Sequence, residues 1–146
     1  MLVGPVFPAL VSAQLIPDTT LPVNSSVPNS CLTCAITGGT LSGDAQTLFH
    51  SFQQFSVPTG GAATFKNDLS LVNIVTRVTG ELPSDIDGAI AVEGRANLFL
   101  LNPNGIVFGP NAVLQVPGSF VASSADSLVF DGGAFSADPL ASTPLL

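Results

Sequence analysis

The apolar residues of this chain occur in short runs of about three to five positions, and each run is followed by residues that form turns. Clear examples are residues 63–65, 89–92, 97–101 and 106–108. Runs of this length, joined by corners of about two to four residues, predict short β-strands with no room for helices between them. The pattern is typical of a solenoid, in which each coil stacks on the one before it.

The expected β-segments lie at residues 36–40, 48–57, 63–65, 69–71, 74–75, 89–92, 97–101, 106–108, 113–116, 120–122 and 128–130. Residues 14–29 contain several prolines, so we expect an extended lead-in or capping strand there. Residues 79–88 are expected to form a loop, because Gly80, Pro83 and Asp85 favour turns. A β-sandwich would use similar elements, but its strands are generally longer. We place it second, although the sequence shows no exact repeat.

The segment at residues 48–57 contains Phe49, Phe52 and Phe55, which recur every three positions. This period by itself favours a helical turn, since residues three or four apart share one face of a helix. The segment is short, however, and Pro58 follows it directly. We therefore predict a strand, with a brief helical turn as the alternative.

The strongest turn signal lies between the apolar residues 98–101 and 106–108. Its Asn-Pro-Asn-Gly sequence contains an asparagine that caps a turn, a proline that presets φ, and two residues that tolerate positive φ. The signal therefore predicts a tight corner between two buried strands. The corner consists of Asn102, Pro103, Asn104 and Gly105, and Ile106 begins the next strand.

Together with its flanks, this corner resembles the filamentous haemagglutinin N-terminal domain, also called the haemagglutination-activity domain, of two-partner secretion exoproteins. The resemblance runs from about Gln14 to Phe135. It implies an all-β, right-handed parallel β-helix with N-terminal capping strands. It also implies that the secretion motif comprises Asn102, Pro103, Asn104, Gly105 and Ile106, and that the supporting positions are Phe49, Phe52, Phe55, Gly88, Gly94 and Asn97.

The same resemblance implies what the domain does. It would be the N-terminal secretion-targeting module of a large surface or secreted exoprotein or adhesin. Its partner would be an outer-membrane barrel transporter with periplasmic domains, and the β-helix would nucleate outside the cell. The route runs through the periplasm and across the outer membrane, and no cofactor is implied.

Residues 1–10 are apolar, and Ser12 and Ala13 precede Gln14 in a pattern that signal peptidases cleave. A basic N-terminal region is missing, and Pro5 and Pro8 interrupt the apolar stretch. We interpret residues 1–13 as the remnant of a signal peptide that starts upstream; an ordinary N-terminus is the alternative. The resemblance implies that residues 14–146 form the secretion domain, in part. We expect it to be truncated, because no capping strand is evident after Asp131, and its last coil would then be an unpaired edge.

Composition narrows the range of partners. The formal net charge is −7, with three basic against ten acidic residues, so the chain cannot neutralise a run of phosphates and nucleic acid is excluded. Trp and Tyr are absent, which counts against the second functional hypothesis, an adhesin domain that binds a host or neighbouring-cell surface ligand such as a glycan. We expect a monomer.

Cys31 and Cys34 form a single Cys-x-x-Cys pair. A zinc site normally needs four ligands, and a redox motif needs a helix start that is not visible here. We expect a local disulfide in an exported protein, with two free thiols as the alternative.

Catalytic chemistry has little support in the sequence. His50 is the only histidine and has no acidic neighbour, so we expect a packing or surface residue. Asp85 and Asp87 superficially resemble a calcium loop, but Ala96 stands where the loop requires Glu. A β-helical polysaccharide-degrading enzyme using Asp85, Asp87, Glu93 and Arg95 is the third hypothesis. Strand alternation would scatter these side chains, so we predict no enzyme and no metal site.

Overall fold

A computed structural model describes residues 13–130 and 133–140 of the chain. The proposed signal-peptide remnant at residues 1–13 therefore lies almost entirely outside the described residues. All regular secondary structure in the described part is β-strand. None of the described residues forms a helix long and apolar enough to span a membrane.

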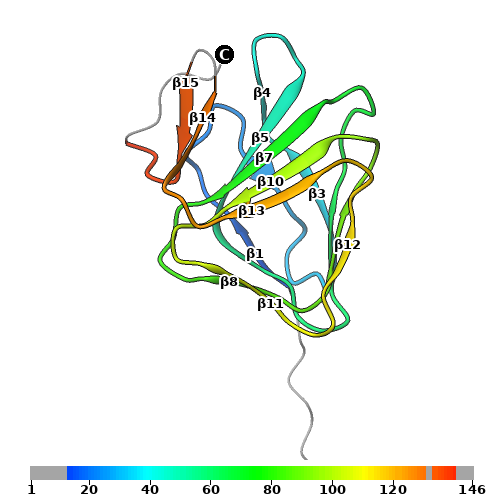
Figure 1. Cartoon of the computed structure of the whole chain (residues 1–146). Coiled ribbons are helices and arrows are strands. Elements are labelled where there is room, and N and C mark those ends of the chain that lie inside the picture. Colours follow the sequence, from blue (N-terminus) through cyan, green and yellow to red (C-terminus); the bar gives the residue numbers. More distant parts are fainter. Residues whose placement is uncertain (1–12, 131–132, 141–146) are drawn as a thin grey trace, which may run out of the picture.

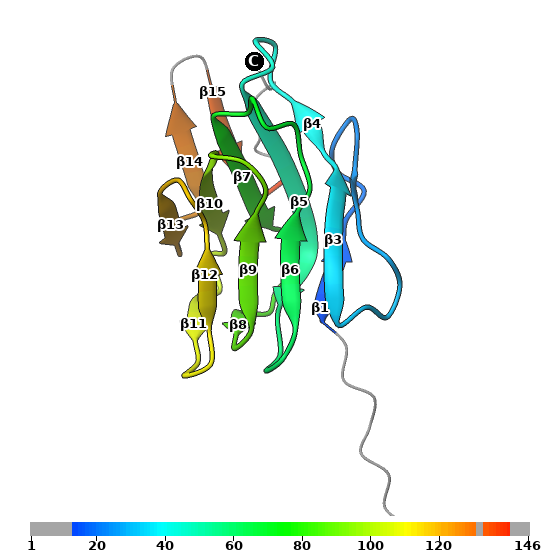
Figure 2. The ribbon, with the colours of Figure 1, turned by 90° about the vertical axis from the view of Figure 1, so that its right-hand side faces the viewer.

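The strands wind into a right-handed parallel β-helix with three faces, which enclose the core as a triangle in Figure 1. The first face consists of β5 (Thr47–Ser56), β7 (Asn73–Val78), β10 (Asn97–Leu101) and β13 (Phe120–Ser123). The second consists of β8 (Ser84–Ile86) and β11 (Ile106–Phe108), with Val57 bridged to Ile86. The third, seen in Figure 2, consists of β3 (Thr33–Gly38), β6 (Ala62–Phe65), β9 (Ala89–Val92) and β12 (Val113–Gln115). The expected solenoid is confirmed.

Successive coils differ in length. Hydrogen-bonded residues on neighbouring coils are separated by 26 positions for Ser51 and Arg77, by 24 for Asn73 and Asn97, and by 22 for Asn97 and Ser119. The strands nevertheless stay in register, because the coils differ at their corners. This variation explains why the sequence shows no exact repeat.

Alternating residues of each strand point into the interior of the β-helix and form its main core. Ile74 pairs in register with Leu98 on the first face, and Ala63 pairs with Ile90 on the third. These side chains, together with Ile86 on the second face, are at most 1% exposed. Each coil therefore buries its inward layer against the layers of its neighbours.

Strand β5 explains the three-residue spacing of its phenylalanines. Its pairing with β1 (Gln14–Pro17) shifts register at Gln53, which has no partner opposite it, so the strand contains a bulge. The bulge lets both Phe52 and Phe55 join the interior cluster, where their rings are 5.2 Å apart. Phe49 points to the other face. The prediction of a strand here is confirmed.

Three short antiparallel strands close the N-terminal end of the solenoid. Strand β1 pairs with β5, β2 (Ser25–Ser26) pairs with β3, and β4 (Thr40–Leu41) pairs with β5. The expectation of a capping strand within residues 14–29 is confirmed by β1 and β2.

Some sequence-based expectations were wrong. Residues 79–88 are not all loop, because β8 lies among them: Pro83 and Gly88 flank the strand, while Ser84 and Ile86 alternate inward and are fully buried. Residues 69–71 are not a strand, and Leu69 is 70% exposed in a turn. The sequence pattern also did not predict β15 (Gly133–Ser136), which forms a hairpin with β14 (Ser127–Phe130).

This hairpin packs on the outside of the first face rather than on the end of the solenoid (Figures 1 and 2). Phe135 is fully buried, and its ring lies 4.8 Å from that of Phe49. Leu21 from the N-terminal segment and Val75 from β7 complete a second apolar cluster. The first face is thus covered on both sides by apolar contacts.

His50 lies inside the solenoid, as a buried packing residue. Its Nδ1 atom is 2.8 Å from the Ser25 hydroxyl, and Nε2 has no hydrogen-bond partner. Burial lowers its pKa from 6.5 to about 4. The unfolded chain therefore binds more protons than the folded chain between these values, and folding stability falls as pH decreases through this window.

We predict that the free energy of unfolding at pH 5 is about 2 kcal/mol lower than at pH 7 because of His50. Denaturant titration of the wild type and of a His50→Gln variant at both pH values measures this difference. The free energy of unfolding of the variant should depend less steeply on pH than that of the wild type, whatever the absolute stability of the variant. Equal pH slopes in the two proteins would contradict the assignment.

Candidate functional site

Residues 102–106 form the corner between β10 and β11, where the chain passes from the first face of the solenoid to the second. The backbone N–H of Gly105 donates to the carbonyl of Asn102 at 3.0 Å, which closes the turn. Gly105 has a φ of 106°, whereas Asn102 and Asn104 do not have positive φ. Within this corner, the expected left-handed conformation is therefore confined to the glycine. The two asparagines stabilise the corner through hydrogen bonds.

The side chain of Asn102 is fully buried, and all its polar atoms are used. Its Nδ2 donates to the carbonyl of Leu82 at 3.1 Å and to the Ser84 hydroxyl at 3.0 Å. Its Oδ1 accepts from the backbone N–H and the side-chain amide of Asn104, both at 3.0 Å. Asn102 therefore joins its own corner to the coil before it.

Two further bonds repeat this connection between coils. The Asn104 side chain donates to the carbonyl of Gly80 at 2.8 Å, and the Ser84 N–H donates to the carbonyl of Gly105 at 3.0 Å. On the other side, the N–H of Asn102 donates to the carbonyl of Ser123. The corner is therefore bonded to the coils on both sides of it.

Exposure differs along the 102–106 corner. Asn104 is exposed, Pro103 and Gly105 are partly exposed, and Ile106 packs partly against the core. In the folded domain, the surface of the corner thus consists mainly of Asn104 and backbone, while the Asn102 side chain is inaccessible.

The supporting positions lie at other places in the fold. A side chain at Gly88 would meet the carbonyl oxygens of Gly61 and Pro58 at 2.5 Å, so the corner between β8 and β9 requires glycine. Gly94 has a φ of 84° in the corner between β9 and β10. Asn97 bridges coils through Asn73 and the N–H of Ser119. These residues and the three phenylalanines shape separate parts of the solenoid and do not form one site with residues 102–106.

Sequence reasoning missed a buried network around Arg77 on the outside of β7. Its guanidinium donates to the Ser51 hydroxyl, the Thr20 hydroxyl and the carbonyl of Ser136, at 2.8 to 2.9 Å. The guanidinium carbon lies 4.3 Å from the centre of the Phe135 ring, a cation–π distance. Arg77 therefore connects the N-terminal segment, the solenoid and the C-terminal hairpin. The available signal was a lone charge within an otherwise uncharged strand.

The charge of this network is balanced by Asp18. Burial lowers the pKa of Arg77, and the charges of Asp18 and Asp138 oppose that effect. Burial raises the pKa of Asp18, but hydrogen bonds from Ser51, Thr20 and Thr79 outweigh it and leave that pKa below its ordinary value. Asp18 is consequently ionised near the buried cation at neutral pH.

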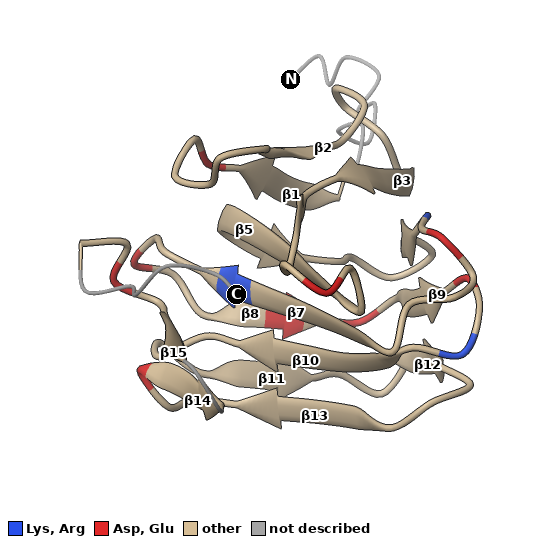
Figure 3. Ribbon diagram, turned by 90° about the horizontal axis from the view of Figure 1, so that it is seen from above, with Lys and Arg blue, Asp and Glu red and all other residues tan. Residues whose placement is uncertain are grey.

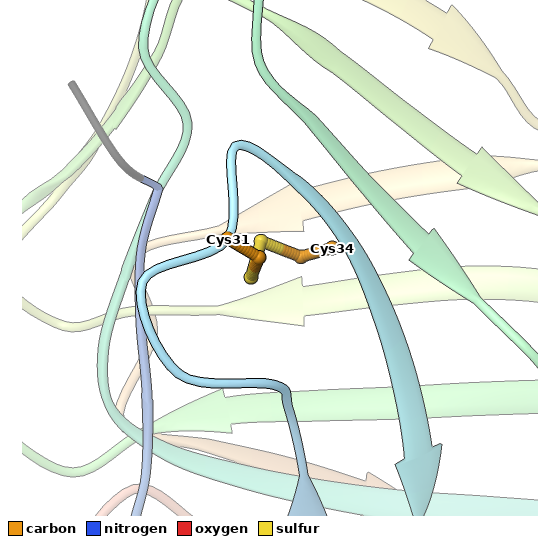
Figure 4. Close-up of a disulfide and its surroundings, with 2 residues drawn as sticks. All are labelled: Cys31 and Cys34. Carbon is orange, nitrogen blue, oxygen red and sulfur yellow. A yellow bond between two sulfur atoms is a disulfide. The ribbon is translucent and has the colours of Figure 1, made fainter. Parts of the chain in front are cut away.

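Cys31, which precedes β3, is joined by a disulfide to Cys34, which lies in β3, and Figure 4 shows the bond spanning the turn. Their Cα atoms are 5.3 Å apart. Cys34 is fully buried in the main core, and Cys31 packs against it from a partly exposed position.

Two of the acidic residues considered for catalysis, Asp87 and Glu93, have structural partners at different corners. Asp87 accepts hydrogen bonds from Thr59 and Asn111, which lie on the coils before and after it. Glu93 forms an ion pair with Lys66 at 2.6 Å. No group of three potential metal-ligating residues occurs among the described residues. As Figure 3 shows, the charges lie mostly in loops and at corners.

A family model for the TPS secretion domain matches residues 13–146. The chain belongs to the TPS secretion domain family. It is also similar to a solved structure described as "Crystal structure of filamentous hemagglutinin secretion domain", with a TM-score of 0.66 and 21% identity. That match covers 82% of this chain and 45% of the other, so the two share a fold over about half the length of the latter. No curated protein matches the sequence.

Membership of the TPS secretion domain family confirms the resemblance seen in the sequence. It supports a secretion-targeting module and favours a non-enzymatic role.

For this TPS secretion domain, we predict that Gly105→Val lowers the free energy of unfolding by about 1 to 3 kcal/mol. A Cβ at Gly105 would have no atom within 4 Å, so the cost arises from the φ of 106° and not from a clash. Gly105→Asn is the matched control, because Asn tolerates positive φ better and should cost less. Unchanged stability of the Val variant in denaturant titration would show that the corner relaxes without strain.

We also predict that Cys31 and Cys34 are disulfide-bonded in the exported TPS secretion domain, since they are three positions apart and the cell exterior is oxidising. Mass spectrometry of secreted material, alkylated without reduction, should find no modified cysteine. Recovery of two alkylated thiols would refute the prediction.

Proposed function

We propose that the partner transporter, an outer-membrane barrel with periplasmic domains, binds this TPS secretion domain while it is unfolded, and that the domain then nucleates the β-helix outside the cell. The signal-peptide remnant at residues 1–13 would complete the route by directing the chain into the periplasm. The downstream protein would be a large surface or secreted exoprotein.

The burial of Asn102 is the observation that carries this proposal. Its side chain is 0% exposed, and all its donors and acceptors are occupied within the folded domain. A transporter that contacted the secretion motif in the folded state would meet mainly Asn104 and backbone groups. The folded corner therefore offers a transporter little of the motif, so we place recognition before folding and on other segments of the chain, and we assign the motif to the folding step.

The strand composition supports the same mode of recognition. Segments such as β7 and β10 contain apolar and β-prone residues, and in the unfolded state they can add to a strand edge of the transporter through backbone hydrogen bonds. On folding, the hydrogen bonds between strands of successive coils replace these bonds to the transporter. Formation of the solenoid on the far side of the membrane opposes return of the chain and biases export without ATP.

In this mechanism the 102–106 corner acts in folding, after the transporter has bound. Asn102 links two coils through buried bonds, so its loss leaves the hydroxyl of Ser84 and the carbonyl of Leu82 without these partners. Asn104 contributes from an exposed position, so its substitution lowers stability less.

The test compares Asn102→Ala with Asn104→Ala as the matched control from the same motif. We expect Asn102→Ala to lower stability by about 2 to 3 kcal/mol and to reduce secretion clearly, whereas Asn104→Ala has a smaller effect on both. The affinity of the urea-unfolded chain for the purified transporter, measured after dilution, should be nearly unchanged in both variants.

Loss of that affinity in both variants would contradict the proposed folding role, because it would mean that the transporter contacts the motif directly. Tighter binding of the folded domain than of the unfolded chain would contradict recognition of the unfolded state.

A further inference from the structure

The corner at residues 102–106 contains the only asparagine of the chain that is followed directly by glycine. An asparagine side chain can react with the backbone nitrogen of the next residue, and glycine allows this reaction most readily because it has no side chain to obstruct the approach. The neighbouring Asn102 cannot react in this way, since Pro103 has no backbone N–H. Asn104 is therefore the position at which this chemistry is most favourable.

The reaction is a deamidation, and water is its only co-reactant. The backbone nitrogen of Gly105 attacks Cγ of Asn104, so that an N–Cγ bond forms and the Cγ–Nδ2 bond breaks. The proton from the backbone nitrogen leaves with the side-chain nitrogen as ammonia. Water then opens the cyclic imide that remains. Addition of water at Cγ gives aspartate, and addition at the backbone carbonyl carbon gives isoaspartate, in which the chain runs through Cβ and Cγ.

In the folded corner, hydrogen bonds occupy both of the groups that would react. The nucleophile, the N–H of Gly105, donates to the carbonyl of Asn102 at 3.0 Å. The leaving group, Nδ2 of Asn104, donates to the carbonyl of Gly80 at 2.8 Å and to Oδ1 of Asn102 at 3.0 Å. Attack must break these bonds and rotate the peptide group that closes the turn. Exposure of Asn104 to water is thus not sufficient for reaction while the solenoid is folded.

Both products fit the corner less well than asparagine does. The two atoms to which the Asn104 side chain donates are oxygens, and an ionised aspartate has no proton to give them. Isoaspartate also adds a methylene to the backbone between Pro103 and Gly105, which lengthens the turn closed by Asn102. The side-chain link from this corner to Gly80 is therefore lost in either product, and the turn itself is altered in isoaspartate.

We propose that Asn104 is a site of spontaneous deamidation in the unfolded chain, that folding protects it, and that chains carrying isoaspartate fold less well. The chemistry depends on the chain alone. Its biological consequence rests on the proposed function, in which export keeps the chain unfolded: the modification then accumulates in copies whose folding is delayed, and it excludes them from forming the solenoid.

Incubation of the purified chain at neutral pH, with and without guanidinium chloride, tests the protection. Peptide mapping by liquid chromatography and mass spectrometry should find Asn104 converted to aspartate and isoaspartate in the denaturant. In the folded protein the rate should be lower by about tenfold or more, because reaction there requires opening of the corner. Asn73, which precedes the bulky Ile74, is the internal reference and should react far more slowly in the denaturant.

The matched variant for the denatured chain is Asn104→Gln. Glutamine keeps the amide but must close a larger and less favourable ring, so deamidation at this position should be lost. The comparison is made in guanidinium chloride and is independent of whether the variant folds.

Refolding of the partly modified chain tests the consequence for the fold. After the denaturant is removed, size-exclusion chromatography separates folded from unfolded copies, and the folded fraction should contain several-fold less isoaspartate at residue 104. Equal reaction rates in the folded and unfolded chain, reaction at Asn73 as fast as at Asn104, or equal isoaspartate in both fractions would overturn the proposal. All readings are made without the transporter, so a failure of the proposed function would change none of them.

Discussion

The fold depends on the requirement that every coil returns to the register of the coil before it. Parallel strands satisfy their backbone groups only with neighbouring coils, so an error at one corner would misplace all inward side chains that follow. Ile74 and Leu98 are buried because β7 and β10 remain aligned although 24 residues separate them. The corners must therefore absorb differences in coil length without disturbing the three faces.

Side chains at the corners meet this requirement by bonding one coil to the next. Asn102 joins the β10–β11 corner to Ser84, Asn97 joins two coils through Asn73, and Asp87 joins Thr59 to Asn111. Asn102 and Asn97, which belong to the residues of the family resemblance, are thus also structural links. Residues 102–106 can therefore serve export through folding, because the links that they form between coils are completed only once the solenoid forms.

The sequence predicted those features that depend on neighbouring residues. It did not predict the features that depend on contacts between segments far apart in the chain. The corner at residues 102–106 and the strand containing Phe52 follow from turn residues and apolar runs. The bulge that buries both Phe52 and Phe55 depends on pairing with β1, and β8 is stable only because coils lie on both sides of it. The roles of Arg77 and of the hairpin depend on contacts between residues 20, 51, 77 and 136, which no local pattern encodes.

The central claim is that the Asn102 side chain stabilises the fold by linking adjacent coils. A double-mutant cycle of Asn102→Ala and Ser84→Ala, measured by chemical denaturation, tests this link directly because their side chains are bonded at 3.0 Å within the core. Our account predicts a coupling free energy of about 1 kcal/mol between the two positions. Additive effects of the two substitutions, with no coupling beyond experimental error, would contradict it.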